Sequence, residues 1–153
     1  MDAGCYAVHC LRLLGPGDPT VTAANALTLK RDRRIDRAMT AQFSFPDGAT
    51  GHLRASMWSS TLLSIRARVV GEHGTLTVNN YVVPNLPSRF TVDVAGRRRR
   101  ERFDGEATYV HQLRAFAAAV RGEPTNLTPP SDSVATMSVI DAIYTAAGLP
   151  PRT

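Results

Sequence analysis

The segment IDRAMTAQFSFPDGATGHLRASMW, residues 35–58, shows what kind of fold this chain adopts. Apolar residues alternate with polar ones from Met39 to Phe45. This two-residue period is typical of a strand with one buried face. The tripeptide Pro46-Asp-Gly48 predicts a tight turn, because proline presets φ and glycine tolerates positive φ. The strand pattern then resumes over Thr50–Trp58, so the segment predicts a β-hairpin.

Segments of similar strand character lie on both sides of this hairpin. Short turns that contain glycine or basic residues separate them, and strands joined by short turns pair antiparallel. We therefore expect an antiparallel sheet over residues 20–104. Its further strands are predicted at Val21–Leu29, Ile65–Val70, Thr75–Val78, Arg89–Val94 and Arg98–Phe103.

Apolar residues recur at helical spacing near both ends of the chain. Residues 1–14 form one such segment, which Gly15-Pro-Gly-Asp-Pro19 ends. Residues 107–148 contain two more, and Ser131-Asp-Ser133 offers a cap for the second of them. The pattern predicts an α+β fold, a large open antiparallel β-sheet with helices packed on one face, as a single domain over residues 1–153.

Composition bounds the class of protein. With 153 residues and 43% hydrophobic residues, the chain can bury one core. No apolar run could cross a bilayer, and no secretory leader pattern opens the chain. Cys5 and Cys10 would point apart on one helix and cannot easily form a disulfide. We therefore expect a reduced, cytoplasmic protein with no membrane partner.

Basic residues dominate the charge, with a net charge of +5 and a pI of about 9.9. Much of the excess lies in Lys30–Arg34 and Arg97–Arg102, at predicted turns, without interleaved aromatic residues. Such clusters are typical of solvated turns, so we expect no nucleic-acid partner. Nucleic-acid binding through Arg97–Arg102, driven by contacts to phosphates, is the alternative, and Arg98→Ala with Arg100→Ala would test it.

The first helix carries the candidate functional residues. Asp2, Tyr6 and His9 recur at i, i+4 and i+7, which places them on one helix face. Each residue type also has an ordinary structural role: the helix dipole favours a carboxylate in the first turn, and tyrosine is common in cores. The opposite stripe is apolar and predicted to be buried: Ala7, Val8, Leu11 and Leu14.

A metal site is a weaker interpretation of the same helix. Cys5 and His9 stand at i, i+4 and offer two ligands, but no third ligand lies nearby in the sequence. We therefore predict no metal. The other histidines are scattered and predict no shared site.

Five segments, in order, resemble the glucose–fructose oxidoreductase, inositol dehydrogenase and rhizopine-catabolism family (Gfo/Idh/MocA). Asp2-Ala-Gly-Cys-Tyr6 resembles the D-x-G-x-Y motif of that family. The resemblance implies a domain that follows a Rossmann domain in family members, here without its first strand. The other four segments are Phe43–Gly51, Val70–Leu76, Tyr109–Phe116 and Ser138–Tyr144.

The resemblance also implies a nicotinamide cofactor, NAD or NADP, for a full-length family member. No G-x-G-x-x-G pattern occurs in these residues, and Lys30 is the only lysine, so the catalytic lysine of the family's E-K-P segment has no counterpart. We therefore expect this chain alone to bind no dinucleotide. Its nucleotide-binding half would be encoded upstream, carried on a separate Rossmann-domain polypeptide, or lost to a misassigned start.

By resemblance, Tyr6 exchanges the substrate hydroxyl proton and Asp2 orients the substrate or the lysine. We add His9 as a contact for a sugar hydroxyl and Trp58 as a residue lining a sugar-binding face, with packing as the alternative for Trp58. The predicted function is the substrate-binding half of an NAD(P)-dependent oxidoreductase of CH–OH donors, acting on a sugar, polyol or dihydrodiol-like alcohol and inactive alone.

A non-catalytic remnant that dimerises or binds a ligand is the alternative. Expected partners are a sugar-like substrate and either a second copy bound through the sheet face or a separate Rossmann-domain chain. Dinucleotide binding separates the two interpretations, because only the first predicts binding once the missing half is supplied.

Overall fold

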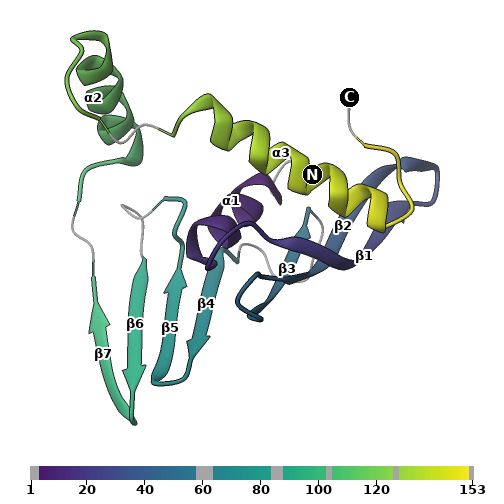
Figure 1. Cartoon of the computed structure of the whole chain (residues 1–153), viewed down its shortest axis with the longest axis horizontal. Helices are drawn as coiled ribbons and strands as arrows, with labels where there is room; N and C mark the ends of the chain where they lie inside the picture. The colour runs from purple at the N-terminus through teal and green to yellow at the C-terminus, as the bar shows by residue number, and fades with distance from the viewer. Residues whose placement is uncertain (1–3, 58–63, 84–87, 103–104, 126–127, 152–153) are drawn as a thin grey trace. The chain divides into compact units, whose positions relative to one another are not determined.

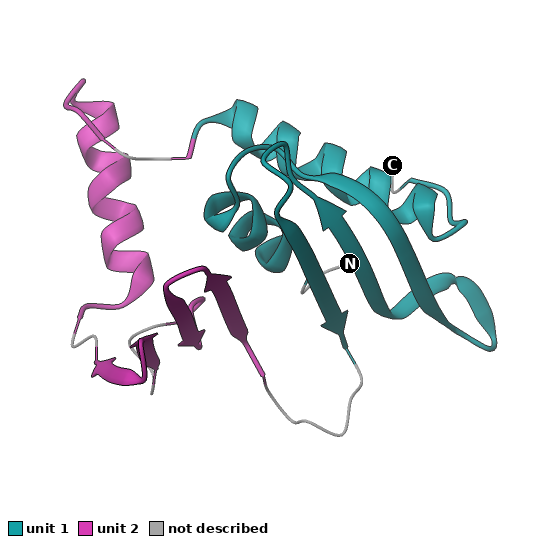
Figure 2. Cartoon of the chain, turned by 60° about the horizontal axis from the view of Figure 1, so that its bottom comes forward, with its two compact units in different colours: residues 1–60, 129–153 teal, residues 61–128 magenta. Residues whose placement is uncertain are grey.

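The computed structural model describes residues 4–57, 64–83, 88–102, 105–125 and 128–151. One helix comes first, seven strands follow, and two helices end the described chain (Figure 1). This order confirms the predicted α+β class. The chain divides into two compact units, residues 1–60 with 129–153 and residues 61–128 (Figure 2). The assignment of all 153 residues to one domain stays a prediction.

The first unit contains a three-stranded antiparallel sheet in the order β1 (Thr20–Leu29), β2 (Asp32–Ser44) and β3 (Thr50–Ser56). The predicted hairpin is β2–β3, in which Ala41 pairs with Leu53. Its turn closes where the Gly48 amide donates to the Phe45 carbonyl oxygen at 3.0 Å, and Gly48 has a φ of 88°. The positive φ explains why glycine stands there.

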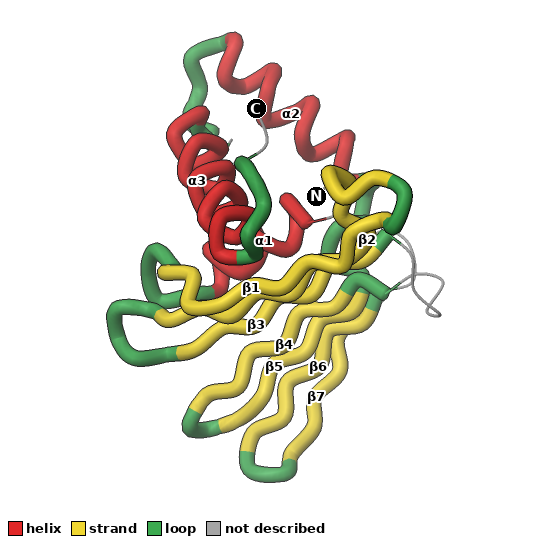
Figure 3. The backbone as a smooth tube through the Cα atoms, turned by 90° about the vertical axis from the view of Figure 1, so that its right-hand side faces the viewer, coloured by secondary structure: helices red, strands yellow, loops and turns green. Residues whose placement is uncertain are grey.

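Two helices cover one face of this sheet, α1 (Gly4–Leu14) and α3 (Pro130–Ala146) (Figure 3). The alternation in β2 supplies the buried side of the sheet, since Met39, Ala41 and Phe43 are at most 2% exposed. Each large apolar side chain buried there contributes about 1.5–3 kcal/mol. The helices contribute Val8, Ile140, Ile143 and Tyr144 to the same core.

Two local expectations for these helices are wrong. The predicted Ser131–Ser133 cap does not form, because α3 begins at Pro130 and its N-cap residue Pro129 makes no side-chain capping bond. Proline suits the first helical position, where its missing N–H would have no helical partner. Leu14 is 44% exposed although its stripe was predicted to be buried. It lies about 120° around the helix from buried Val8, on the flank of the core-facing side.

The second unit contains a four-stranded antiparallel sheet and α2 (Thr108–Val120). The strands that the sequence assigned to one open sheet are thus hydrogen-bonded in groups of three and four. The arginines of the last strand alternate between the two faces of this sheet, since Arg98 pairs with Asp93 and Arg100 with Thr91 on one face. In order, the strands are β4 (Arg66–Gly71), β5 (Gly74–Asn79), β6 (Arg89–Val94) and β7 (Arg97–Glu101).

None of the three described helices is both long enough and apolar enough to span a bilayer.

Helix α2 has no buried residue and exposes its apolar side chains. These side chains are Tyr109, Leu113, Phe116 and Val120.

Candidate functional site

The exposed face of α1 is the candidate site. Tyr6 is 57% exposed, whereas Val8 on the opposite side of the helix is fully buried. His9 follows Tyr6 by three residues and therefore lies on the same face. Its side chain is 44% exposed. The predicted site residues Asp2 and Trp58 lie outside the described residues, so their roles stay predictions.

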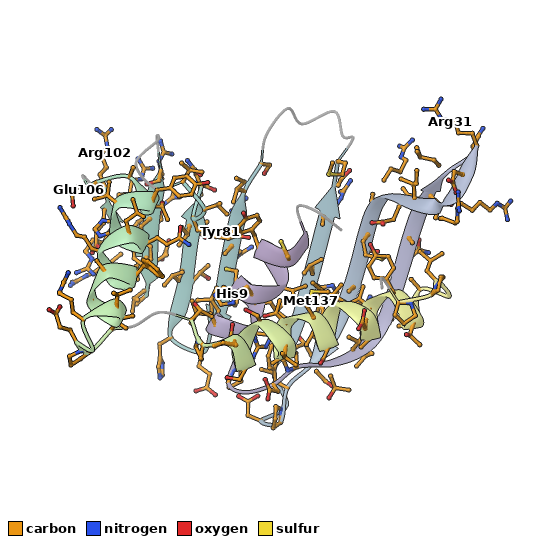
Figure 4. The ribbon with its side chains drawn as sticks, turned by 90° about the horizontal axis from the view of Figure 1, so that it is seen from above. His9, Arg31, Tyr81, Arg102, Glu106 and Met137 are labelled. Carbon is orange, nitrogen blue, oxygen red and sulfur yellow. The ribbon has the colours of Figure 1, made fainter. Side chains whose placement is uncertain are left out.

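Helix α3 adds a carboxylate to this face. Asp132 Oδ2 lies 3.1 Å from His9 Nδ1. Figure 4 shows His9 on α1 where that helix runs beside α3. The two atoms are close, yet Asp132 Oδ2 accepts no hydrogen bond of good geometry from the described residues, and it is shielded from solvent. The structure therefore places an imidazole and a carboxylate from opposite ends of the sequence side by side.

Arg12 holds that carboxylate in place. Its Nη1 donates to Asp132 Oδ1 at 2.8 Å, to the Asp132 carbonyl oxygen at 3.2 Å and to Thr136 Oγ1 at 2.8 Å. Its Nη2 lies 3.6 Å from Asp18 Oδ1. The Arg12 side chain is only 12% exposed, so its charge needs these partners. Arg12 thereby joins α1 to the first turns of α3.

Sequence reasoning missed Asp132, Arg12 and Thr136. One signal was available: Asp132 and Thr136 stand at i, i+4 and so share a face of α3. Nothing local indicates that this face meets Arg12. The structure shows no disulfide between the neighbouring cysteines Cys5 and Cys10. No cluster of three metal-ligating side chains occurs among the described residues.

The other face of the three-stranded sheet is polar and hollowed. A depression of about 360 Å³ lies over the three strands. It falls within the size range of small-molecule sites. The register places its polar side chains opposite the core-facing positions of each strand. They are Asn25, Thr40, Gln42, His52 and Arg54.

The described residues do not fit a nicotinamide dinucleotide. Such a site needs a strand, a glycine-rich turn and a helix N-terminus within a parallel βαβ unit. Every strand pair in the described chain is antiparallel. The one lysine, Lys30, is an exposed residue in the turn between β1 and β2. The described residues can therefore offer a phenol, an imidazole and carboxylates to a substrate, but no cradle for a dinucleotide.

Together, the sheet and the polar face of α1 define an α+β domain of the kind found in two-domain oxidoreductases. The chain belongs to the GFO/IDH/MocA C-terminal domain family, which it matches over residues 1–77. This confirms the family resemblance carried by the α1 motif and the hairpin.

A curated relative extends the likeness beyond that match. The chain is 34% identical over 150 residues to D-xylose 1-dehydrogenase (NADP(+)) 2 of Haloferax volcanii, covering 96% of this chain and 45% of that protein. The chain thus spans less than half the length of this relative. The names of the relatives support an oxidoreductase domain and NAD(P) as the cofactor of the family.

Solved structures show the same fold. An aldose–aldose oxidoreductase from Caulobacter crescentus, complexed with glycerol, matches with a TM-score of 0.79 and 21% identity. A 3-ketoreductase from Actinomadura kijaniata, complexed with NADP and TDP-benzene, matches with a TM-score of 0.80 and 21% identity. Each match covers 95% of this chain and 44% of the other chain. At this identity the likeness concerns the fold.

Proposed function

We propose that this chain is the substrate-binding half of an NAD(P)-dependent oxidoreductase that acts on a sugar, polyol or dihydrodiol-like alcohol, and that it is inactive alone. The observation that carries the proposal is Tyr6, which stands in the D-x-G-x-Y motif and projects from the exposed face of a helix packed on the sheet. The activities named for two similar proteins, a D-xylose 1-dehydrogenase and an aldose–aldose oxidoreductase, support the substrate class.

In this proposal the Tyr6 phenol exchanges a proton with the reacting hydroxyl of the substrate. A phenol can both donate and accept a hydrogen bond, which suits it to hold that oxygen in either direction of the reaction. His9, three residues further along the helix, contacts a second hydroxyl. Asp2 and Trp58 complete the proposed substrate contacts. We assign nucleotide binding to residues outside this chain, since the described residues do not fit the cofactor.

The test restores a nucleotide-binding half. The corresponding half of the Haloferax volcanii relative is fused ahead of this chain, and NADP binding and oxidation of D-xylose and other sugars are measured. We expect the fusion to turn over at least one sugar and the chain alone to turn over none. A fusion that binds NADP but oxidises no sugar would refute the proposal.

Tyr6→Phe in the fusion tests the assigned residue. We expect its turnover to fall by about 10²-fold or more, because proton transfer by a positioned group contributes about that much. NADP binding should be unchanged. Tyr109→Phe is the matched control, because Tyr109 is a 77% exposed tyrosine on α2. If both variants retain activity equally, Tyr6 does not carry the proton.

A non-catalytic dimerising or ligand-binding domain is the second candidate. The polar hollow over β1–β3 favours it, since this face offers a surface to a ligand or a second copy independently of α1. This candidate predicts association or ligand binding that Gln42→Ala weakens, together with a fusion that has no sugar oxidation. Sedimentation of the isolated chain and activity of the fusion therefore separate the two.

A further inference from the structure

We infer that Asp132 is a positioning residue of the α1 site: it fixes the tautomer of His9 so that Nε2, the ring nitrogen that does not contact Asp132, accepts a hydrogen bond from a substrate hydroxyl. The substrate part of this inference rests on the proposed function. The tautomer part does not, because it depends only on groups within the first compact unit.

The tautomer follows from the chemistry of the contact. An ionised carboxylate can only accept hydrogen bonds, so the His9 nitrogen 3.1 Å from Asp132 Oδ2 is the one that carries hydrogen. In a neutral imidazole the other nitrogen then holds a lone pair. His9 is 44% exposed at its side chain, which leaves the ring open to a ligand.

Contacts with Arg12 hold the Asp132 carboxylate beside His9. Arg12 donates to Oδ1 and to the backbone carbonyl oxygen of Asp132, so turning the carboxylate away would break the bond to Oδ1. Oδ2 is shielded from solvent and receives no well-directed hydrogen bond from the described residues. A buried oxygen of this kind calls for a donor. His9 Nδ1, 3.1 Å away, is a donor within reach of Oδ2.

The arrangement selects for hydroxylated substrates. Tyr6 would engage the reacting hydroxyl, while His9 Nε2, on the same face, would accept the hydrogen of a neighbouring one. A simple alcohol without that second hydroxyl would leave Nε2 without its partner. One such hydrogen bond increases binding affinity about 3–10-fold. The pair Asp132–His9 thus favours polyols and sugars over monohydroxy alcohols.

The imidazole tautomer can be measured directly by ¹⁵N NMR of the histidine-labelled chain, at a pH where the ring is neutral. We expect His9 to carry hydrogen on Nδ1. Asp132→Asn should invert this state, because the asparagine oxygen would face Arg12 and its amide NH₂ would face Nδ1. Asp18→Asn is the matched control, since Asp18 approaches Arg12 at 3.6 Å and is 88% exposed. It should leave the tautomer unchanged.

A wild-type His9 protonated on Nε2, or a tautomer unaffected by Asp132→Asn, would overturn the inference. These spectra need no catalysis, so they stand even if the fusion proves inactive and the proposed function fails. In an active fusion, Asp132→Asn should raise KM for a sugar about 3–10-fold. The KM for a monohydroxy alcohol, which makes no bond to Nε2, should change less than the KM for the sugar. An equal rise in KM for both substrates would show that Asp132 has a merely structural role.

Discussion

Removing the hydroxyl of Tyr144 tests how the terminal helix is held to the sheet. The Tyr144 side chain is completely buried in the core of the first unit. Its hydroxyl donates to Asp36 Oδ1 on β2 at 2.7 Å. This length is typical of a hydrogen bond between a hydroxyl and a charged oxygen. The substitution Tyr144→Phe keeps the ring and removes the hydroxyl that makes this bond.

The expected loss follows from that contact. A hydrogen bond to a charged group contributes about 1.5–3 kcal/mol, so Tyr144→Phe should lower the free energy of unfolding by that amount. For a chain of this size, the loss corresponds to a fall in Tm of about 3–12 °C. Urea unfolding followed by far-UV circular dichroism measures it, with an unchanged m-value as the sign of an unchanged fold.

Tyr109→Phe supplies the control, because this tyrosine on α2 is 77% exposed. Its substitution should change stability by less than about 0.5 kcal/mol. Asp36→Asn completes a double-mutant cycle, in which the coupling energy with Tyr144→Phe should be at least about 0.5 kcal/mol. If Tyr144→Phe is no more harmful than Tyr109→Phe, the bond does not stabilise the packing of α3.

Three further predictions concern other parts of the structure. Met39→Ala should cost about 2–5 kcal/mol in urea unfolding, because this core side chain is 1% exposed. Gly74→Ala should cost about 1–3 kcal/mol, because a Cβ there would collide with a backbone carbonyl of the paired strand. Gly105→Ala is the control and should cost less than about 0.5 kcal/mol, because a Cβ there would lie within 4 Å of no neighbour among the described residues. The Arg121 guanidinium lowers the pKa of the Glu123 carboxyl, so Arg121→Gln should raise that pKa in an NMR titration. The pair stabilises the chain above the unfolded pKa of Glu123, and this contribution is lost as pH falls through the folded pKa.

Local patterns in the sequence predicted most of the secondary structure. The β2–β3 hairpin follows from alternation on either side of a Pro-Asp-Gly turn, and both signals act between residues close in sequence. The grouping of seven strands into sheets of three and four could not be found this way. Each strand pattern shows which face is buried but not which other strand completes the hydrogen bonds.

The residues of the candidate site also differ in whether the sequence could predict them. Tyr6 and His9 could be found because helical spacing alone places them on one face. Asp132 was misinterpreted as part of a helix cap, since capping is the local role that its position at the start of a helix favours. Its actual partners, Arg12 and His9, lie on the first helix and become neighbours only when both helices pack on the same sheet.

This pairing makes the proposed chemistry dependent on the last helix as much as on the first. An isolated helix of 11 residues is marginal in water, and α1 has that length. Val8 holds it against the core, and Arg12 ties it to Asp132 and Thr136. The direction in which Tyr6 faces is therefore set by residues from both ends of the chain. A motif on α1 can position a proton donor only after α3 has folded beside it.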